Sequence, residues 1–84
     1  MPVISRFYGI VIRMYFLQGE HNPPHIHAIY NEDVVVVDFM TGEVLDGFLP
    51  PGPLRLVRKW VSLHKEALLN MWCTQEFRKL PPLE

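Results

Sequence analysis

Residues 53–72 read PLRLVRKWVSLHKEALLNMW, and this stretch decides the fold. When its residues are spaced at about 100°, the apolar side chains gather in one half of the helical wheel. That half holds Leu56, Val57, Trp60, Val61, Leu63, Ala67, Leu68, Met71 and Trp72. Pro53 suits the first helical position, where its missing N–H costs nothing. We therefore predict one long amphipathic helix over about 53–72, whose wide apolar side must cover another layer.

The segment before this helix is typical of a sheet, because aromatic and β-branched residues alternate between turn signals. The expected strands are Tyr8–Phe16, His25–Tyr30, Val34–Met40 and a shorter Glu43–Leu49. The short turns between them favour antiparallel neighbours. The sequence thus predicts an α+β fold. A three- or four-stranded antiparallel sheet over about 3–49 precedes the helix, which packs on one sheet face. Residues 73–84 form a helical extension or a tail.

The bulk composition is that of one small globular domain spanning residues 1–84, with 49% apolar residues and a net charge of −1. This balance gives no global field for nucleic acid. The single cysteine, Cys73, fits a reducing compartment because it has no internal partner. The apolar run Ile10–Leu17 is interrupted by Arg13, and a bilayer span needs about 20 residues. With no secretory leader pattern, we expect a cytoplasmic protein that does not enter a membrane.

Three of the four histidines, His21, His25 and His27, fall within seven residues. His25 and His27 are two apart on an expected strand, so their rings should share a face. Imidazole binds zinc and nickel, and three ligands with an open position is the pattern of catalytic zinc. Glu20 could add a fourth ligand. One interpretation is therefore a metal site at His21, His25 and His27.

Two further interpretations of the same histidines need no metal. Two imidazoles of near-neutral pKa can act as acid and base, for example in cleaving a phosphodiester. Arg6, Arg13 or Lys59 could then hold the phosphate. In the structural interpretation, the histidines only satisfy backbone groups of the Pro23-Pro24 loop or pair across strands. Spacing alone does not separate these alternatives.

The fourth histidine, His64, falls near the middle of the apolar half of the expected helix. The simpler interpretation is a buried histidine that hydrogen-bonds a backbone carbonyl. In the other interpretation, the helix covers the sheet face that carries His25 and His27, and His64 completes their site.

Two other groups are candidate binding residues. Arg6 and Tyr8 could stack on or grip a nucleotide or a peptide. They could instead belong to an anchored N-terminal strand with Gly9 at a bulge. Arg55 and Arg58 lie on the basic side of the expected helix and could touch RNA phosphates. Such a row is also typical of a solvated helix surface.

The chain resembles one family over about Val3 to Trp72. The motifs are RFYGI at 6–10, HNPPHxH at 21–27, TGEVLxGxLP at 41–50 and LRLVxxW at 54–60. They resemble the bacterial domain-of-unknown-function family DUF4160. The resemblance implies a small bacterial protein that is often encoded beside a second small protein and is suspected to belong to a toxin–antitoxin pair. It points to Arg6, Tyr8, His21, His25, His27 and His64, without an established role for any of them.

Three functional hypotheses follow. The first is an interaction protein of a toxin–antitoxin-like pair, whose partner is the product of the neighbouring gene and whose histidine-bearing surface binds that partner. A homodimer and an RNA partner are also open. The second is a small metal-independent ribonuclease that uses two of His21, His25 and His27. The third is a zinc- or nickel-binding protein that uses all three.

Overall fold

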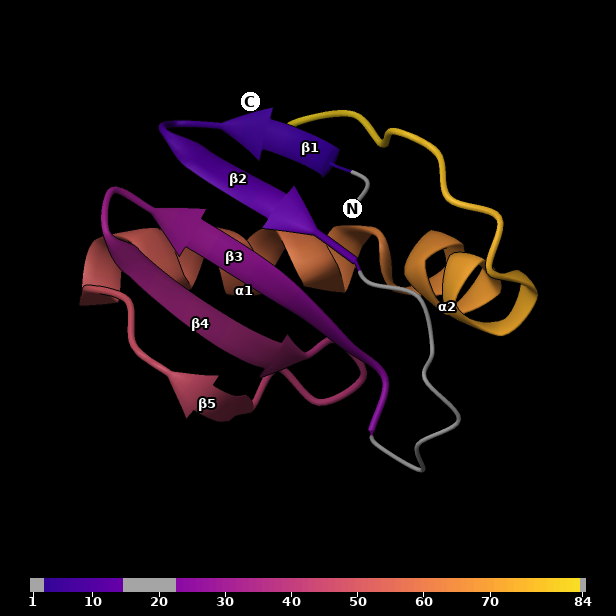
Figure 1. The fold of residues 1–84 in the computed structure, drawn as a ribbon, viewed down its shortest axis with the longest axis horizontal. Helices are drawn as coiled ribbons and strands as arrows, with labels where there is room; N and C mark the ends of the chain where they lie inside the picture. Colours follow the sequence, from indigo (N-terminus) through magenta and orange to yellow (C-terminus); the bar gives the residue numbers. More distant parts are fainter. Residues whose placement is uncertain (1–2, 15–22, 84) are drawn as a thin grey trace.

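The computed structural model describes residues 3–14 and 23–83 (Figure 1). In chain order the elements are β1 (Val3–Phe7), β2 (Ile10–Arg13), β3 (His25–Tyr30), β4 (Asp33–Asp38), β5 (Val44–Gly47), α1 (Pro51–Leu63) and α2 (Lys65–Thr74). The five strands form one antiparallel sheet in the order β1-β2-β3-β4-β5, so each strand pairs with its neighbours in sequence. The predicted α+β class is confirmed, whereas the prediction of three or four strands was too low.

The extra strand arises at the start of the chain. Tyr8 and Gly9 have φ of 50° and 79°, so they form the tight turn of a hairpin and do not begin a strand. β1 therefore ends at Phe7, and the strand predicted over Tyr8–Phe16 begins too early. The irregularity in the β1–β2 pairing falls between Val3 and Ser5, so Gly9 lies in the turn rather than at a bulge.

The single predicted helix is two helices. His64 has φ −114° and ψ 20°, which leave the helical region and separate α1 from α2. No proline or glycine marks this break, and the apolar periodicity continues on both sides of it. The sequence pattern therefore does not reveal it. α1 also begins at Pro51, two residues before the predicted start, and α2 ends at Thr74.

The chain after α2 is a tail without helix or strand over residues 75–83. It runs back across the molecule to the first strand (Figure 1). There the Leu80 N–H donates to the Ile4 carbonyl over 2.8 Å, and the Trp60 Nε1–H donates to the Pro81 carbonyl over 2.9 Å. The tail is therefore held to both β1 and α1.

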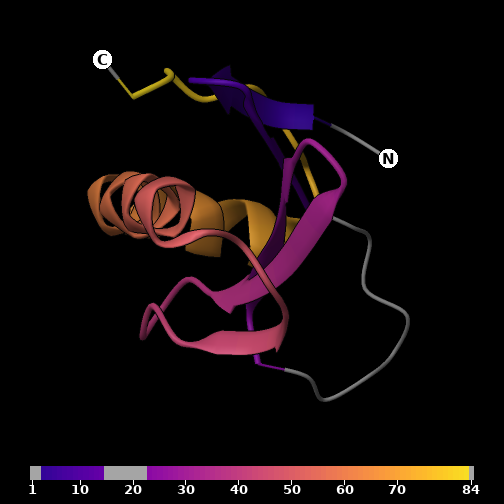
Figure 2. The same ribbon diagram turned by 90° about the vertical axis from the view of Figure 1, so that its left-hand side faces the viewer.

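The core lies between one face of the sheet and the two helices, which both pack on that side (Figure 2). The alternating residues Ile26 and Ala28 of β3 and Val35 and Val37 of β4 are fully buried. The helices contribute the buried residues Val57, Trp60, Val61, Leu68 and Met71. Each valine, isoleucine, leucine or methionine among them stabilises the fold by about 1.5–3 kcal/mol through burial. None of the described helices is long and apolar enough to cross a membrane.

Two glycines with similar backbones offer a matched test of the sheet. Gly47 has φ 78° and Gly42 has φ 81°. A Cβ on Gly47 would overlap the Val34 carbonyl oxygen of the adjacent strand, whereas a Cβ on Gly42 meets nothing within 4 Å.

We expect Gly47→Ala to lower the free energy of unfolding by about 2–5 kcal/mol, through positive-φ strain and overpacking. Gly42→Ala should cost only about 1–2 kcal/mol, from the strain alone. Urea unfolding followed by circular dichroism measures both variants. Equal losses would show that the close approach of β4 and β5 at Gly47 is wrong.

Candidate functional site

The sheet has a second face, opposite the helices, and it carries the strand histidines. The burial of β3 alternates, with Ile26 and Ala28 toward the core, so His25 and His27 point to the other side. We call this surface the histidine face. Its members are Arg6 of β1, Val11 and Arg13 of β2, His25, His27 and Ile29 of β3, and Val34 and Val36 of β4.

The strand register places His27 within a row of cross-strand neighbours. Arg13 of β2 is directly opposite His27 on one side, and Val36 of β4 is opposite on the other. Asp46 of β5 follows Val36 in the same row. Directly opposed residues share a face and lie close together, so a guanidinium flanks the imidazole.

His25 is the first residue of β3, two positions before His27. Its Nδ1 is 2.8 Å from the Pro23 carbonyl oxygen, and because a carbonyl can only accept, Nδ1 carries the proton. This bond fixes the ring and leaves Nε2 with a lone pair in the neutral form. The ring centroid of His25 is 5.4 Å from that of His27 and 5.1 Å from that of Trp72 on α2. The two strand histidines thus form a pair at the end of the sheet.

The environment favours a neutral His27. Burial of the ring lowers its pKa below the ordinary value of 6.5, and the neighbouring charge of His25 lowers it further. A neutral imidazole can accept a proton or bind a metal ion.

Of the three histidines that the metal interpretation requires, the structure describes two, His25 and His27. His21 lies outside the described residues, and residues 3–14 and 23–83 contain no group of three His, Cys, Asp or Glu side chains placed to hold a metal ion. The zinc or nickel site therefore stays a prediction from the sequence.

His64 lies apart from the strand histidines, on the helical side of the sheet. It occupies the junction of α1 and α2, with its ring centroid 4.9 Å from that of the buried Trp60. Burial lowers the pKa of His64, and a hydrogen bond with the backbone of Pro81 acts in the opposite direction. Since the helices pack on the face of Ile26 and Ala28, the condition for His64 to complete the strand-histidine site is not met.

The structure also separates Arg6 from Tyr8. Arg6 is exposed on the histidine face and pairs with Val11, in the row next to that of His27. Tyr8 is 59% exposed at the tip of the β1–β2 hairpin, where its ring packs edge-on against Phe7. That tip is at the Tyr30 end of β3, away from His25. Arg6 therefore shares a surface with the histidine pair, and Tyr8 does not.

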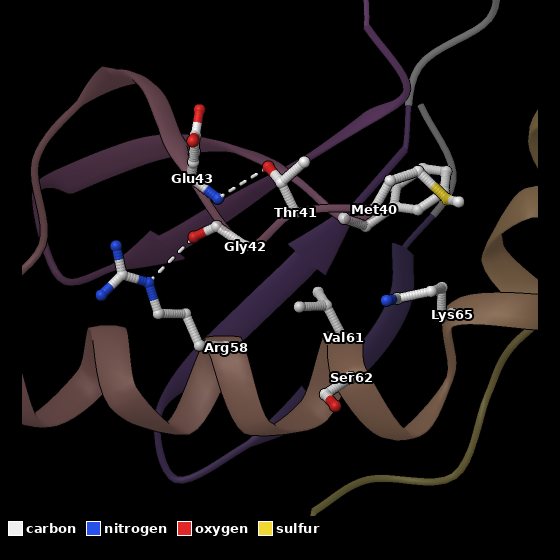
Figure 3. A pocket seen from close by; sticks show the side chains of 9 residues that line it. Met40, Thr41, Gly42, Glu43, Arg58, Val61, Ser62 and Lys65 are labelled. Carbon is white, nitrogen blue, oxygen red and sulfur yellow. Dashed lines mark hydrogen bonds between the residues drawn. The ribbon is translucent and has the colours of Figure 1, made fainter.

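Arg55 and Arg58 line a groove between α1 and the segment from Met40 to Leu49. Arg58 Nε donates to the Gly42 carbonyl over 2.9 Å (Figure 3). On one side of this bond is a pocket of about 370 Å³, lined by Phe39, Met40, Thr41, Gly42, Glu43, Arg58, Val61, Ser62 and Lys65. On the other is a more apolar pocket of about 480 Å³, lined by Val44, Gly47, Phe48, Leu49, Pro51, Leu54, Arg55 and Arg58.

Sequence reasoning missed most of this groove. The sequence predicts the motif from Thr41 to Pro50 only as a family feature that contains a short strand. Nothing in the spacing reveals that the turn after β4 folds over α1, because this depends on the tertiary packing of the hairpin.

The comparisons identify the family. The sequence model of the family described as "Domain of unknown function (DUF4160)" matches residues 9–73. The chain belongs to this family, and the resemblance noted from its motifs is confirmed. Neither the curated proteins nor the solved structures contain a match to the chain.

The lowered pKa of His27 predicts how stability depends on pH. Because the folded chain holds this ring neutral, the unfolded chain binds more protons once the pH falls below about 6.5. The contribution is therefore fully present above that pH and is lost as the pH falls through the folded pKa. We expect the loss of stability between about pH 7 and pH 5 to be smaller in His27→Asn than in the wild type. His64 titrates in the same direction and leaves a residual slope.

NMR titration of His25→Asn provides the control. The pKa of His27 should rise, since the charge of His25 is gone, but should stay below 6.5 because burial is the larger cause. A His27 pKa above 6.5 in the wild type would contradict this account.

Proposed function

We propose that this protein is the binding component of a two-protein, toxin–antitoxin-like pair, and that it contacts the second protein through the histidine face. The observation that carries the proposal is the one-sided packing of the sheet: α1 and α2 both lie on one side, and of the described helices only Trp72 of α2 reaches the other side, where it lies beside His25 at the end of β3 (Figure 2).

The composition of the histidine face suits a protein partner. Apolar residues lie at its centre: Val34 is 45% exposed, and Val11, Ile29 and Val36 are half-buried. A contiguous apolar strip on a sheet face is typical of an interaction surface. Charged residues flank the strip, with Arg6 and Arg13 toward β1 and Asp46 on β5, in the way that a polar rim surrounds an apolar interface core. The partner that the family resemblance suggests is the small protein encoded by the neighbouring gene.

Two exposed apolar residues on different sides of the molecule allow a matched test. Val34→Arg places a charge within the histidine face, whereas Leu63→Arg does so at the end of α1, where Leu63 is 65% exposed. We expect Val34→Arg to weaken binding of the neighbouring gene's product at least about tenfold, and Leu63→Arg to leave it unchanged within about twofold. Calorimetry with the purified full-length proteins measures both.

The other possible occupant of the histidine face is a second copy of the chain, and the oligomeric state of the purified chain tests this alternative. If light scattering shows a dimer that Val34→Arg dissociates, and the neighbouring gene's product does not bind, a second copy covers the face and the proposal is wrong. Equal weakening by both variants would also contradict it.

Histidine acid–base chemistry is a second candidate, favoured by the geometry of the pair. His27, with its lowered pKa, would take the proton from a ribose 2′-hydroxyl as that oxygen attacks the adjacent phosphorus. Protonated His25, oriented by the Pro23 carbonyl, would give a proton to the departing 5′-oxygen from Nε2. Arg13, opposite His27, would hold the phosphate. The products are a 2′,3′-cyclic phosphate and a 5′-hydroxyl.

For this candidate, we expect His25→Asn and His27→Asn each to slow RNA cleavage about 100-fold or more. His64→Asn should leave the rate nearly unchanged, because His64 lies on the helical side. Cleavage of a labelled oligoribonucleotide across a range of pH measures this, and the wild-type profile should be bell-shaped. Wild-type rates in both strand-histidine variants would exclude the ribonuclease and leave the binding proposal standing.

A further inference from the structure

We infer that the 370 Å³ pocket between the turn Met40–Glu43 and the junction of α1 with α2 binds a phosphate monoester. None of the residues that line this pocket belongs to the histidine face. The inference does not depend on the proposed partner binding.

Cations from two helices line the pocket, one at each end (Figure 3). Arg58 comes from α1 and Lys65 is the first residue of α2. The Lys65 side chain runs along the pocket with its ammonium group directed inward, and the Arg58 guanidinium stands at the other end (Figure 3). The Lys65 ammonium group supplies a point charge for a phosphate dianion, and the Arg58 guanidinium supplies a fork of donors for a polar group at the other end of the compound.

Both cations are available for a ligand. Arg58 uses only its Nε, toward the Gly42 carbonyl, so its two terminal nitrogens keep their donors. Neither Arg58 nor Lys65 forms an ion pair with a carboxylate of residues 3–14 or 23–83. Glu43 also lines the pocket, but its carboxylate points away from α1 (Figure 3).

The wall opposite the helix is held in place by its own hydrogen bonds. The carboxylate of Asp38 accepts the N–H groups of Met40 at 2.8 Å and Thr41 at 3.2 Å, and the Asp38 carbonyl accepts the N–H of Gly42 at 2.7 Å. Since Asp38 is 9% exposed, this turn is anchored in the fold. An anchored wall lowers the cost of ordering the site when a ligand binds.

The remaining lining fits the rest of a small phosphorylated compound. Ser62 also lines the pocket, and the buried Phe39 and Val61 with the exposed Met40 form an apolar floor. A volume of about 370 Å³ exceeds what a phosphate group alone needs and lies in the range of small-molecule sites. We therefore assign the phosphoryl group to Lys65, the organic part of the compound to the floor, and a polar group of that part to Arg58.

The test is an NMR titration of the ¹⁵N-labelled full chain with inorganic phosphate and, separately, with adenosine monophosphate, at constant ionic strength. The amides of Thr41, Gly42 and Ser62 should shift and saturate. Lys65→Met keeps most of the side-chain length and removes the charge, so it should weaken binding about tenfold or more. Lys79→Met removes an exposed charge of the tail outside the pocket lining and should change binding by less than about twofold.

Each outcome bears on the inference. Tighter binding of adenosine monophosphate than of free phosphate supports the organic part lying on the floor, and equal binding supports a site for the phosphoryl group alone. The inference is overturned if no amide of the turn shifts, or if Lys65→Met and Lys79→Met have the same effect. Neither result bears on the histidine face.

Discussion

The rest of the structure depends on the packing of Trp60. This side chain is fully buried in the middle of α1 and stacks on Phe7 of β1, with ring centroids 5.8 Å apart. Its indole N–H donates to the Pro81 carbonyl, and its ring lies against His64 at the helix junction. One residue therefore joins the first strand, both helices and the tail. Because a buried indole needs a hydrogen-bond partner, the tail is required to complete the core.

This packing also decides where chemistry can occur. Trp60 and its neighbours hold both helices against the face of Ile26 and Ala28, so the side chains that alternate with them in β3 project from the other side. The same arrangement places α1 beside the hairpin of β4 and β5, and the groove lined by Arg55 and Arg58 lies between them. The two candidate surfaces thus lie on opposite sides of one sheet, and a substitution on one can leave the other intact.

The parts of the structure that follow from local pattern could be predicted. The alternation of apolar and polar residues predicted the bounds of β3 and the shared side of His25 and His27. The helical periodicity of apolar residues predicted the apolar side of α1. The remaining features depend on tertiary contacts. The helical wheel does not reveal the break at His64, because the apolar residues keep their spacing on both sides of it and only the backbone of His64 leaves the helical region. The Tyr8-Gly9 turn was missed because both residues also fit a strand pattern. The pocket lined by Arg58 and Lys65 also depends on the turn Met40–Glu43, which is distant from both helices in the sequence and meets them only in the folded chain.

The contact between the tail and β1 has a consequence for how the chain folds. All strand pairings join neighbours in sequence, so the sheet can form from local segments as they are synthesised, which favours rapid folding. The bond from Leu80 to Ile4, in contrast, joins two segments that are far apart in the sequence. Because a contact between distant segments requires the closure of a long loop, the core around Trp60 closes only after the strands have paired. The tail therefore controls when folding is completed.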